Sequence, residues 1–342
     1  MADCLRGYRQ VIPRWRQLHP AVHNRCMTET IHKIPVGISS CLIGEQVRFD
    51  GGHKLDRYIN SRLADFMEFR PFCPEVAIGL GIPRAPIRLV STTHGIRVRG
   101  VKDPDLDVTE RLSEYGRRIA QRMDDLCGYI FKSRSPSCGM ERVKTYGEDG
   151  LPGRSEGVGA YAREIMHAHP DLPVEEEGRL NDPGLRDNFI ERVFTWYRWQ
   201  QLLAQGITPA RLVQFHSRQK LSVMAHNQAA YRRLGQLVAT AGSKDFGALC
   251  KRYEHELMQA MQRLATRKSH TNTLQHLQGY FSKQLCADDR AELCAAIDDY
   301  RLGLVPLAVP LTLIRHHFRH HPNEWALQQT YLEPYPRELM HS

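Results

Sequence analysis

The sequence predicts an α/β domain followed by an all-α domain. In the first half, short apolar segments rich in β-branched residues alternate with helical ones, which predicts a parallel sheet with helices on its faces. From Phe189 onward nearly every segment has the apolar spacing of a helix. We therefore expect an N-terminal extension over residues 1–33, an α/β domain over residues 34–181 and a helical domain over residues 182–342.

Buried strands are expected where apolar runs end in turn residues. They begin with IPVGIS at residues 34–39 and continue with FMEFRPF at 66–72, IRLV at 87–90 and GYIF at 128–131. Helices are expected between them, at residues 55–68 and 108–126. The second has apolar residues three to four positions apart, as expected of a helix with one buried side: Leu112, Tyr115, Ile119 and Met123. Residues 148–164 are rich in glycine and are expected to form a loop that leads into a short helix.

Three cysteines follow expected strands. Cys41, Cys73 and Cys138 each lie in a turn behind an apolar run. Ligands of open α/β sheets bind beyond the carboxyl ends of the strands, so we expect these thiols at one shared site. An iron–sulfur cluster normally takes four cysteines, so a set of three would leave one iron open to a substrate. Glu75, two residues after Cys73, is then close enough to activate a water molecule as a general base.

The remaining composition narrows the class of protein. No run of eighteen apolar residues occurs, so no membrane span is expected, and the first twenty residues lack the apolar core of a secretory signal. The chain is therefore expected in the cytoplasm. No C-x-x-C is present, which argues against a zinc ribbon or a thioredoxin-type pair. In a reducing compartment the other six cysteines are expected to be free thiols: Cys4, Cys26, Cys127, Cys250, Cys286 and Cys294.

Positive charge is concentrated in two stretches of the helical half. The chain has a net charge of +9, and residues 211–240 and 261–283 contain no aspartate or glutamate. Such stretches are typical of a surface that binds nucleic acid, although solvated helix faces have the same composition. The side chains expected to contact RNA are Arg218, Lys220, Arg232, Arg233, Arg267 and Lys268.

The cysteine segments also carry a family resemblance. They read VGISSCLIGEQVRFDGG, FRPFCPEVAIGLGIPR and FKSRSPSCGMERVK. These words resemble the signature of the thiouracil desulfidase (TudS) family, whose members bind a [4Fe-4S] cluster through three cysteines and remove sulfur from thiolated pyrimidines. The second half resembles the YbgA-like domain in the words FHSRQKLSVMAHNQAAYRRLG, HTNTLQHLQGYFSKQL and YLEPYPREL. A chain that joins both is similar to the TudS–YbgA fusion group, which includes the RudS desulfidases of 4-thiouridine in tRNA.

This resemblance implies a cofactor, a reaction and two catalytic residues. Cys41, Cys73 and Cys138 would hold a [4Fe-4S] cluster with one open iron. Glu75 and Ser135 match the glutamate and serine that are catalytic in the family. The implied reaction is a non-redox hydrolysis of 4-thiouridine in tRNA, because oxygen replaces sulfur at a constant oxidation level and the products are uridine and sulfide.

Other residues near the cysteines have two expected uses. Several small residues would shape the pocket and donate hydrogen bonds to cluster sulfurs: Ser39, Ser40, Ser137 and Gly139. Two pairs of basic residues could meet a phosphate, although solvation explains exposed charge equally well: Lys54 with Arg48, and Lys132 with Arg134.

Two other functions stay open on the sequence. The chain could desulfurate free thiolated pyrimidine bases or nucleotides, with the helical half serving oligomerisation. It could instead be a nucleic-acid-binding protein whose cysteines hold a structural or redox-sensing cluster. Three ligands beside Glu75 favour an enzyme, and the basic helical half favours a macromolecular substrate. No pattern indicates the oligomeric state, the relative orientation of the domains or the fate of the sulfide.

Overall fold

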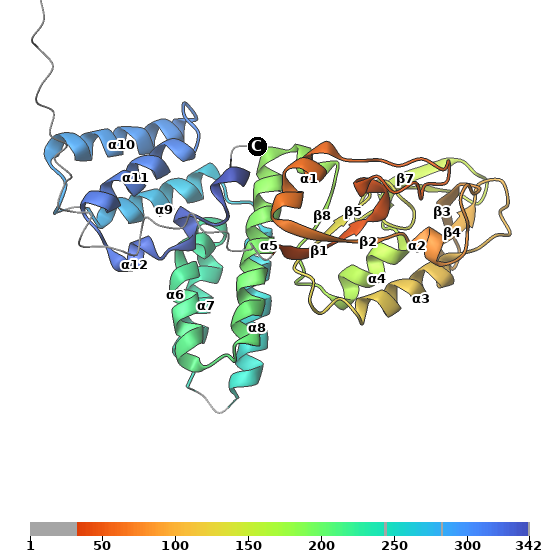
Figure 1. Cartoon of the computed structure of the whole chain (residues 1–342), viewed down its shortest axis with the longest axis horizontal. Coiled ribbons are helices and arrows are strands. Elements are labelled where there is room, and N and C mark those ends of the chain that lie inside the picture. Colours follow the sequence, from red (N-terminus) through yellow and green to blue (C-terminus); the bar gives the residue numbers. More distant parts are fainter. Residues whose placement is uncertain (1–32, 243–244, 282, 341–342) are drawn as a thin grey trace, which may run out of the picture. The chain divides into compact units, whose positions relative to one another are not determined.

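The computed structural model describes residues 33–242, 245–281 and 283–340. The expected N-terminal extension therefore lies outside the described residues except for Lys33. From Ile34 onward the chain forms one unit. The predicted fold class is confirmed: an α/β half with a parallel sheet is followed by a mostly helical half (Figure 1).

Sheet A is the parallel sheet that the sequence predicts. Its strands are β1 (Ile34–Ser39), β2 (Met67–Phe72), β5 (Tyr129–Phe131) and β8 (Val174–Glu176), in the order β2-β1-β5-β8. Every neighbouring pair is parallel, and Ser39 lies opposite Phe72 at the carboxyl ends of β1 and β2. Loops that leave β2, β1 and β5 therefore start from one edge of the sheet.

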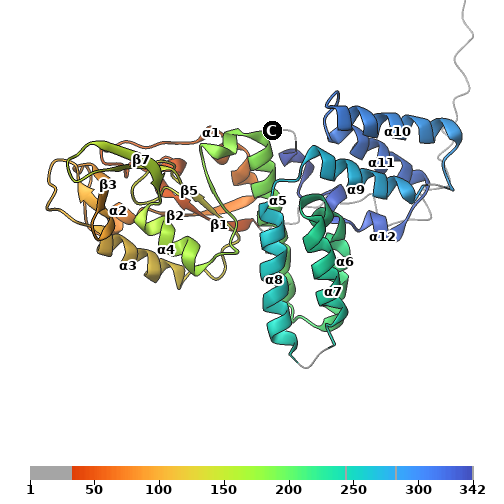
Figure 2. The ribbon, with the colours of Figure 1, turned by 180° about the vertical axis from the view of Figure 1, so that it is seen from behind.

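Side chains alternate between the two faces of sheet A, as the two-residue period of a strand requires. Ile34, Val36 and Ile38 of β1 belong to one apolar core, whereas Tyr129 and Phe131 of β5 belong to another. The faces are covered by different helices. The first core includes residues of α1 (Arg57–Ser61) and α5 (Pro183–Ala204), and the second includes residues of α3 (Thr109–Ala120) and α4 (Ala160–Ala168) (Figure 2).

A second sheet was not expected from the sequence. Sheet B contains β3 (Ile87–Thr92), β4 (Gly95–Gly100), β6 (Val143–Tyr146) and β7 (Pro152–Gly157), in the order β4-β3-β6-β7. The IRLV run was expected in the same sheet as the other strands, but β3 lies in sheet B, where it forms an antiparallel hairpin with β4 and pairs in parallel with β6. Residues 148–164 were expected to be a loop before a helix, yet they include β7, which pairs with β6 and is mostly exposed.

The connections between strands are shorter and less regular than predicted. Residues 55–68 were expected to form one helix, but they form α1, a 3-10 turn at Leu63–Asp65 and the start of β2. Two further short elements follow strand ends: the 3-10 turn η2 (Ser40–Ile43) after β1 and α2 (Pro74–Ala77) after β2. Both carry residues of the predicted site.

The second half consists of helices joined by short turns, as predicted. After α5 come α6 (Pro209–His226), α7 (Gln228–Ala239), α8 (Phe246–Gln262), α9 (Arg267–Gly279), α10 (Ala287–Leu302), α11 (Ala308–His320) and α12 (Glu324–Leu327). Side-chain oxygens cap the N-termini of several of them, including α5, α6, α7 and α9. In the described part of the chain, no helix is both long and apolar enough to cross a membrane.

The helix α5 begins at the predicted domain boundary but packs against the α/β half. That boundary falls just before Asp182, whose side chain caps α5. However, Phe189, Ile190 and Val193 of α5 pack into the same core as β1. Tyr335 and Leu339, near the end of the described chain, join this core as well. The helical half thus contributes apolar side chains to one face of sheet A, and tests of function require the full chain.

Candidate active site

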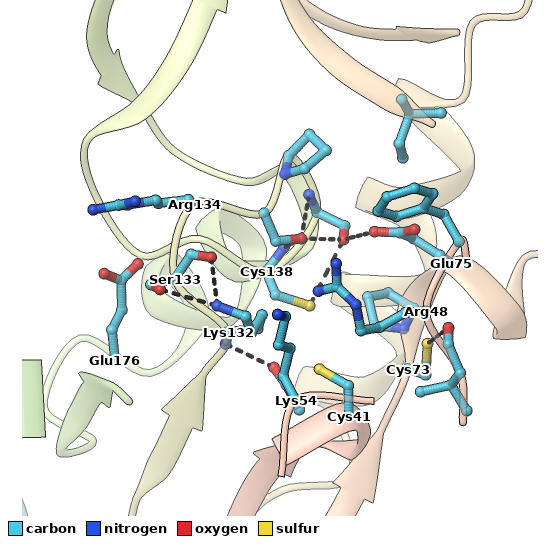
Figure 3. Close-up of a pocket in the computed structure, with 18 of the residues that line it drawn as sticks. Cys41, Arg48, Lys54, Cys73, Glu75, Lys132, Ser133, Arg134, Cys138 and Glu176 are labelled. Atoms are coloured by element: carbon cyan, nitrogen blue, oxygen red, sulfur yellow. Dashed lines mark hydrogen bonds between the residues drawn. The ribbon is translucent and has the colours of Figure 1, made fainter. Parts of the chain in front are cut away.

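The three predicted cysteines come together at one edge of sheet A. Cys41 lies in η2 behind β1, Cys73 directly follows β2, and Cys138 lies in the loop that leaves β5. Because β2, β1 and β5 are neighbours, their outgoing segments meet. All three residues line one cavity of about 1020 Å³, and Figure 3 shows their sulfurs around the same space.

Burial determines the protonation state of the three thiols. Cys41 and Cys138 are buried, Cys73 is partly buried, and all three are free of disulfides. Burial disfavours the thiolate and raises the pKa of Cys41 to about 11. It also raises the pKa values of Cys73 and Cys138. Without a compensating cation these side chains are neutral thiols at pH 7.

Local groups partly oppose the effect of burial on these pKa values. The charge of Lys132 counteracts the increase in the pKa of Cys41, and the backbone N–H of Val76 counteracts the increase in the pKa of Cys73. The hydroxyl groups of Ser39 and Ser137 act in the same direction on the pKa of Cys138. The structure thus provides each sulfur with a group that stabilises its negative charge, which is what a metal-bound thiolate needs.

This donor set fits a sulfur-ligated cluster. The other cysteines in the described residues, Cys127, Cys250, Cys286 and Cys294, do not line the cavity, so it offers three thiols and no fourth. Within the described residues no three histidine, cysteine or carboxylate side chains converge as ligands of a single metal ion. Ligands of a multi-iron cluster bind different irons and need not converge on one point.

Glu75 is held by an arginine that the sequence analysis did not identify. Arg84 donates to Glu75 Oε2 from Nε at 2.9 Å and from Nη2 at 2.7 Å. The Arg84 side chain is only 5% exposed and that of Glu75 15%. Arg84 also donates to the carbonyl oxygens of Gly81 and Val47. One oxygen of the carboxylate is therefore fixed by the guanidinium, and the other, Oε1, remains for chemistry.

One serine, Ser137, connects Oε1 with Ser135, the second predicted catalytic residue. Ser137 Oγ donates to Glu75 Oε1 at 2.6 Å, and Ser135 Oγ lies 2.9 Å from Ser137 Oγ. Because the Ser137 proton is committed to Glu75, the Ser135 hydroxyl is the donor in the second bond. Ser135 Oγ in turn accepts from the backbone N–H of Cys138 at 3.1 Å. Glu75 and Ser135, which were predicted separately, therefore belong to one directed hydrogen-bond chain.

The loop that carries Ser135 and Cys138 is positioned by its neighbours. A side chain at Gly159 would place Cβ 2.5 Å from the carbonyl oxygen of Ser137, so only glycine permits this approach. Glu177 accepts from the backbone N–H of Ser133 at 2.7 Å and pairs with Lys132. The acidic run at residues 175–177 therefore supports the site.

Positive charge predominates on the cavity wall. Among the described residues that line the cavity there are three glutamates and eight basic residues: Arg48, Lys54, Arg84, Lys132, Arg134, Arg142, Lys144 and Arg179. Three of the eight pair closely with carboxylates: Arg84 with Glu75, Lys132 with Glu177, and Arg179 with Glu141 and Glu175. The rest leave the cavity with an excess of positive charge.

The residues predicted to contact RNA are spread over three helices. Arg218 and Lys220 lie on α6, Arg232 and Arg233 on α7, and Arg267 and Lys268 on α9. Two of them have intramolecular partners. Arg233 Nε is 3.3 Å from Glu256, and Arg267 donates to the Tyr300 carbonyl oxygen at 2.7 Å. Arg218, Arg232 and Lys268 are exposed and form no ion pair among the described residues.

The fold and site define an α/β domain with a three-thiol cavity, and a family model agrees with that class. Residues 36–177 match the family model described as 2-thiouracil desulfurase. A solved structure of the [4Fe-4S]-dependent thiouracil desulfidase TudS is 26% identical, covering 44% of this chain and 94% of that chain, with a TM-score of 0.35.

The helical half is similar to a second group of proteins. Residues 220–336 match a family model described as a protein of unknown function (DUF1722). The uncharacterized protein YbgA of Escherichia coli (strain K12) is 35% identical over 159 residues, which cover 46% of this chain and 94% of YbgA. The chain belongs to the YbgA family, and the expected combination of a TudS-type domain with a YbgA-like domain is confirmed.

Proposed function

We propose that this protein is an iron–sulfur desulfidase that hydrolyses the thiocarbonyl group of 4-thiouridine in tRNA. One observation carries the proposal: Cys41, Cys73 and Cys138 line one cavity together with a chain of hydrogen bonds that runs from Arg84 through Glu75 and Ser137 to Ser135. The desulfurase family model over residues 36–177 supports the same chemistry.

The three cysteines would hold a [4Fe-4S] cluster. When bound, it would supply a soft Lewis acid for the thiocarbonyl sulfur at the iron that lacks a protein thiolate. The overall reaction exchanges sulfur for the oxygen of water, and since carbon keeps its oxidation level, no electron donor is required.

Side chains of the protein would transfer the protons of the reaction. Glu75 Oε1 accepts from Ser137 and has a second lone pair, with which it would take a proton from the attacking water. Arg84 would keep Oε2 fixed, so that Oε1 stays directed toward the cavity. Once Glu75 holds that proton, the hydrogen bonds would reverse direction, with Glu75 donating to Ser137 and Ser137 to Ser135. The Ser135 hydroxyl would then be released to donate its proton to the leaving sulfur.

Two properties favour a phosphate-bearing substrate over a free base. A cavity of about 1020 Å³ lies at the upper end of the range for small-molecule sites, about 300–1,000 Å³. Its excess of positive charge would be of no use to a neutral base. RNA would also be held by the exposed cations of the helical half, because phosphate contacts provide most non-specific affinity for nucleic acids.

Charge reversal tests the RNA assignment. Arg232→Glu combined with Lys268→Glu changes one exposed cation in each basic stretch, on α7 and α9. We expect KM for thiolated tRNA to rise at least about 10-fold, and the salt dependence of tRNA binding to weaken by about two units of log–log slope. The matched control is Lys251→Glu with Arg319→Glu, two exposed cations outside these stretches. Equal losses in both variants would reject the RNA surface. If the wild type acted on thiolated nucleotides but not on tRNA, the small-substrate alternative would replace it.

A further inference from the structure

Two arginines on the cavity wall have left-handed backbone conformations. Arg134 has a φ of 59° and Arg142 a φ of 53°, and both line the active-site cavity. In the described residues, every other residue with positive φ is glycine. A residue with a side chain is strained in this region because Cβ approaches the carbonyl oxygen, whereas glycine adopts it freely. Such strain persists only where the surrounding structure imposes it, and strained residues cluster at active sites and ligand clamps.

Within the part of the chain that the structure describes, no contact explains why arginine occupies these two positions. Arg134 is exposed and forms no hydrogen bond or ion pair among the described residues. Arg142 is 81% exposed, and its Nε is 3.8 Å from Glu141. The carboxylate of Glu141 is already bound by Arg179 at 2.6 Å. The arginines therefore do not hold the loop through their guanidinium groups.

Their position relates them to the catalytic loop. Arg134 and Arg142 flank the segment that carries Ser135, Ser137 and Cys138. Figure 3 shows Arg134 on the opposite side of Cys138 from Glu75. A ligand whose base lay between Glu75 and the cysteines would have its other end directed toward this side of the cavity. Arg84, Lys132 and Arg179 are neutralised by glutamates, so these two exposed guanidinium groups retain their charge for a ligand.

We propose that Arg134 and Arg142 form a phosphate-binding rim for the sugar–phosphate part of the substrate. Guanidinium groups bind phosphate through two parallel hydrogen bonds, which gives both affinity and orientation. The phosphate would be the 5′-monophosphate of a thiolated nucleotide or a phosphodiester of RNA next to the thiolated base. This inference rests on the proposed desulfidase function and adds the group by which the α/β half recognises its substrate.

The test is the double variant Arg134→Gly, Arg142→Gly in the full chain with its cluster loaded. Turnover is compared for 4-thiouracil, 4-thiouridine 5′-monophosphate and a thiolated RNA oligonucleotide. We expect kcat/KM for the phosphate-bearing substrates to fall about 10- to 100-fold more than kcat/KM for the base, since hydrogen bonds to charged groups are lost. A loss confined to the RNA would identify a phosphodiester as the ligand. A loss on both would identify the 5′-phosphate of the thiolated nucleotide, which both substrates carry.

A second measurement separates binding from folding. Metal-free full-length protein is titrated with UMP and with uridine by calorimetry, and its melting temperature is recorded. The variant should lose the preference for UMP and melt no lower than the wild type, because glycine removes the left-handed strain. Arg154→Ala is the control, since Arg154 is 85% exposed in the same half but does not line the cavity. It should change neither quantity.

Two results would overturn the rim. The first is an equal change of kcat/KM for base and nucleotide, and the second is a lower melting temperature with the UMP preference intact, which would assign the arginines to the loop. A wild-type protein that turns over none of the thiolated substrates would reject the proposed function instead, while the UMP and uridine titrations would still decide on the rim.

Discussion

The ion pair between Arg84 and Glu75 gives the most quantitative prediction. Arg84 donates two hydrogen bonds to Glu75 Oε2, at 2.7 and 2.9 Å, and both side chains are largely buried. A hydrogen bond to a charged group contributes about 1.5–3 kcal/mol, so two contribute about 3–6 kcal/mol. The carboxylate retains 15% exposure and would recover some hydration once the arginine is gone. We therefore expect a coupling free energy of about 2 kcal/mol.

A double-mutant cycle isolates this coupling. Urea unfolding of metal-free wild type, Arg84→Gln, Glu75→Gln and the double variant gives the term that depends on both side chains. The bonds from Arg84 to the carbonyl oxygens of Gly81 and Val47 are present with either glutamate or glutamine at position 75, so they cancel. A coupling below about 0.5 kcal/mol, as for an exposed pair, would refute the description of this contact as a buried clamp.

The same contact should also affect turnover. In Arg84→Gln, kcat should fall about 10²-fold, because a misplaced catalytic oxygen costs that much. Iron and sulfide content should stay at the wild-type level. Arg111→Gln is a matched control, since Arg111 donates to the carbonyl oxygen of Ile78 in the same region without touching Glu75. An equal decrease of kcat in both variants would show that Arg84 acts through the loop and not through Glu75.

Three more predictions follow from other parts of the structure. Replacing Cys41, Cys73 or Cys138 singly with Ser should remove most of the bound iron and sulfide. The control Cys250→Ser, which alters a buried thiol of α8 outside the cavity, should not. Normal cluster content in any of the first three variants would contradict the ligand set. Gly159→Ala should lower the melting temperature and disturb cluster loading together, because its Cβ would lie 2.5 Å from the Ser137 carbonyl oxygen; an unchanged protein would mean that the loop is free to move. Burial opposes the charge of His226, but Glu191, 3.0 Å from Nε2, outweighs it and raises the His226 pKa. A raised histidine pKa stabilises the folded state, and this stabilisation is complete below the unfolded-state pKa of about 6.5 and is lost as pH rises through the folded-state pKa. The free energy of unfolding should therefore decline above pH ~6.5 in the wild type but not in His226→Gln. Parallel pH profiles of the two proteins would refute this.

The sequence was sufficient for the features that repeat along the chain. The apolar runs of β1 and β5 predicted buried strands, and the three- to four-residue apolar spacing predicted a helix with one buried side where α3 lies. The cysteines were placed together because parallel strands must end at one edge. Sheet B was missed because β7 is mostly exposed and has no apolar alternation, so its strand conformation depends on pairing with β6.

Tertiary contacts account for what the sequence could not indicate at the site. Arg84 lies in a turn with no recognisable pattern, and its role arises only when the turn folds back on Glu75. Ser137 was expected to shape the pocket, but the fold gives it the bond that joins Glu75 to Ser135. A run of acidic residues such as 175–177 resembles a solvated edge until Glu177 is seen against Lys132.

The central claim is that three thiols and Glu75 form one desulfurating site. The most direct test mixes anaerobically reconstituted full-length protein with tRNA that contains 4-thiouridine, and measures the sulfide released and the 4-thiouridine lost. We expect one sulfide per 4-thiouridine converted to uridine, without added reductant. We also expect Glu75→Gln to retain its iron and sulfide but to turn over at least about 10²-fold more slowly. Cluster-loaded wild type that leaves 4-thiouridine intact, or that requires an electron donor to remove its sulfur, would contradict this claim.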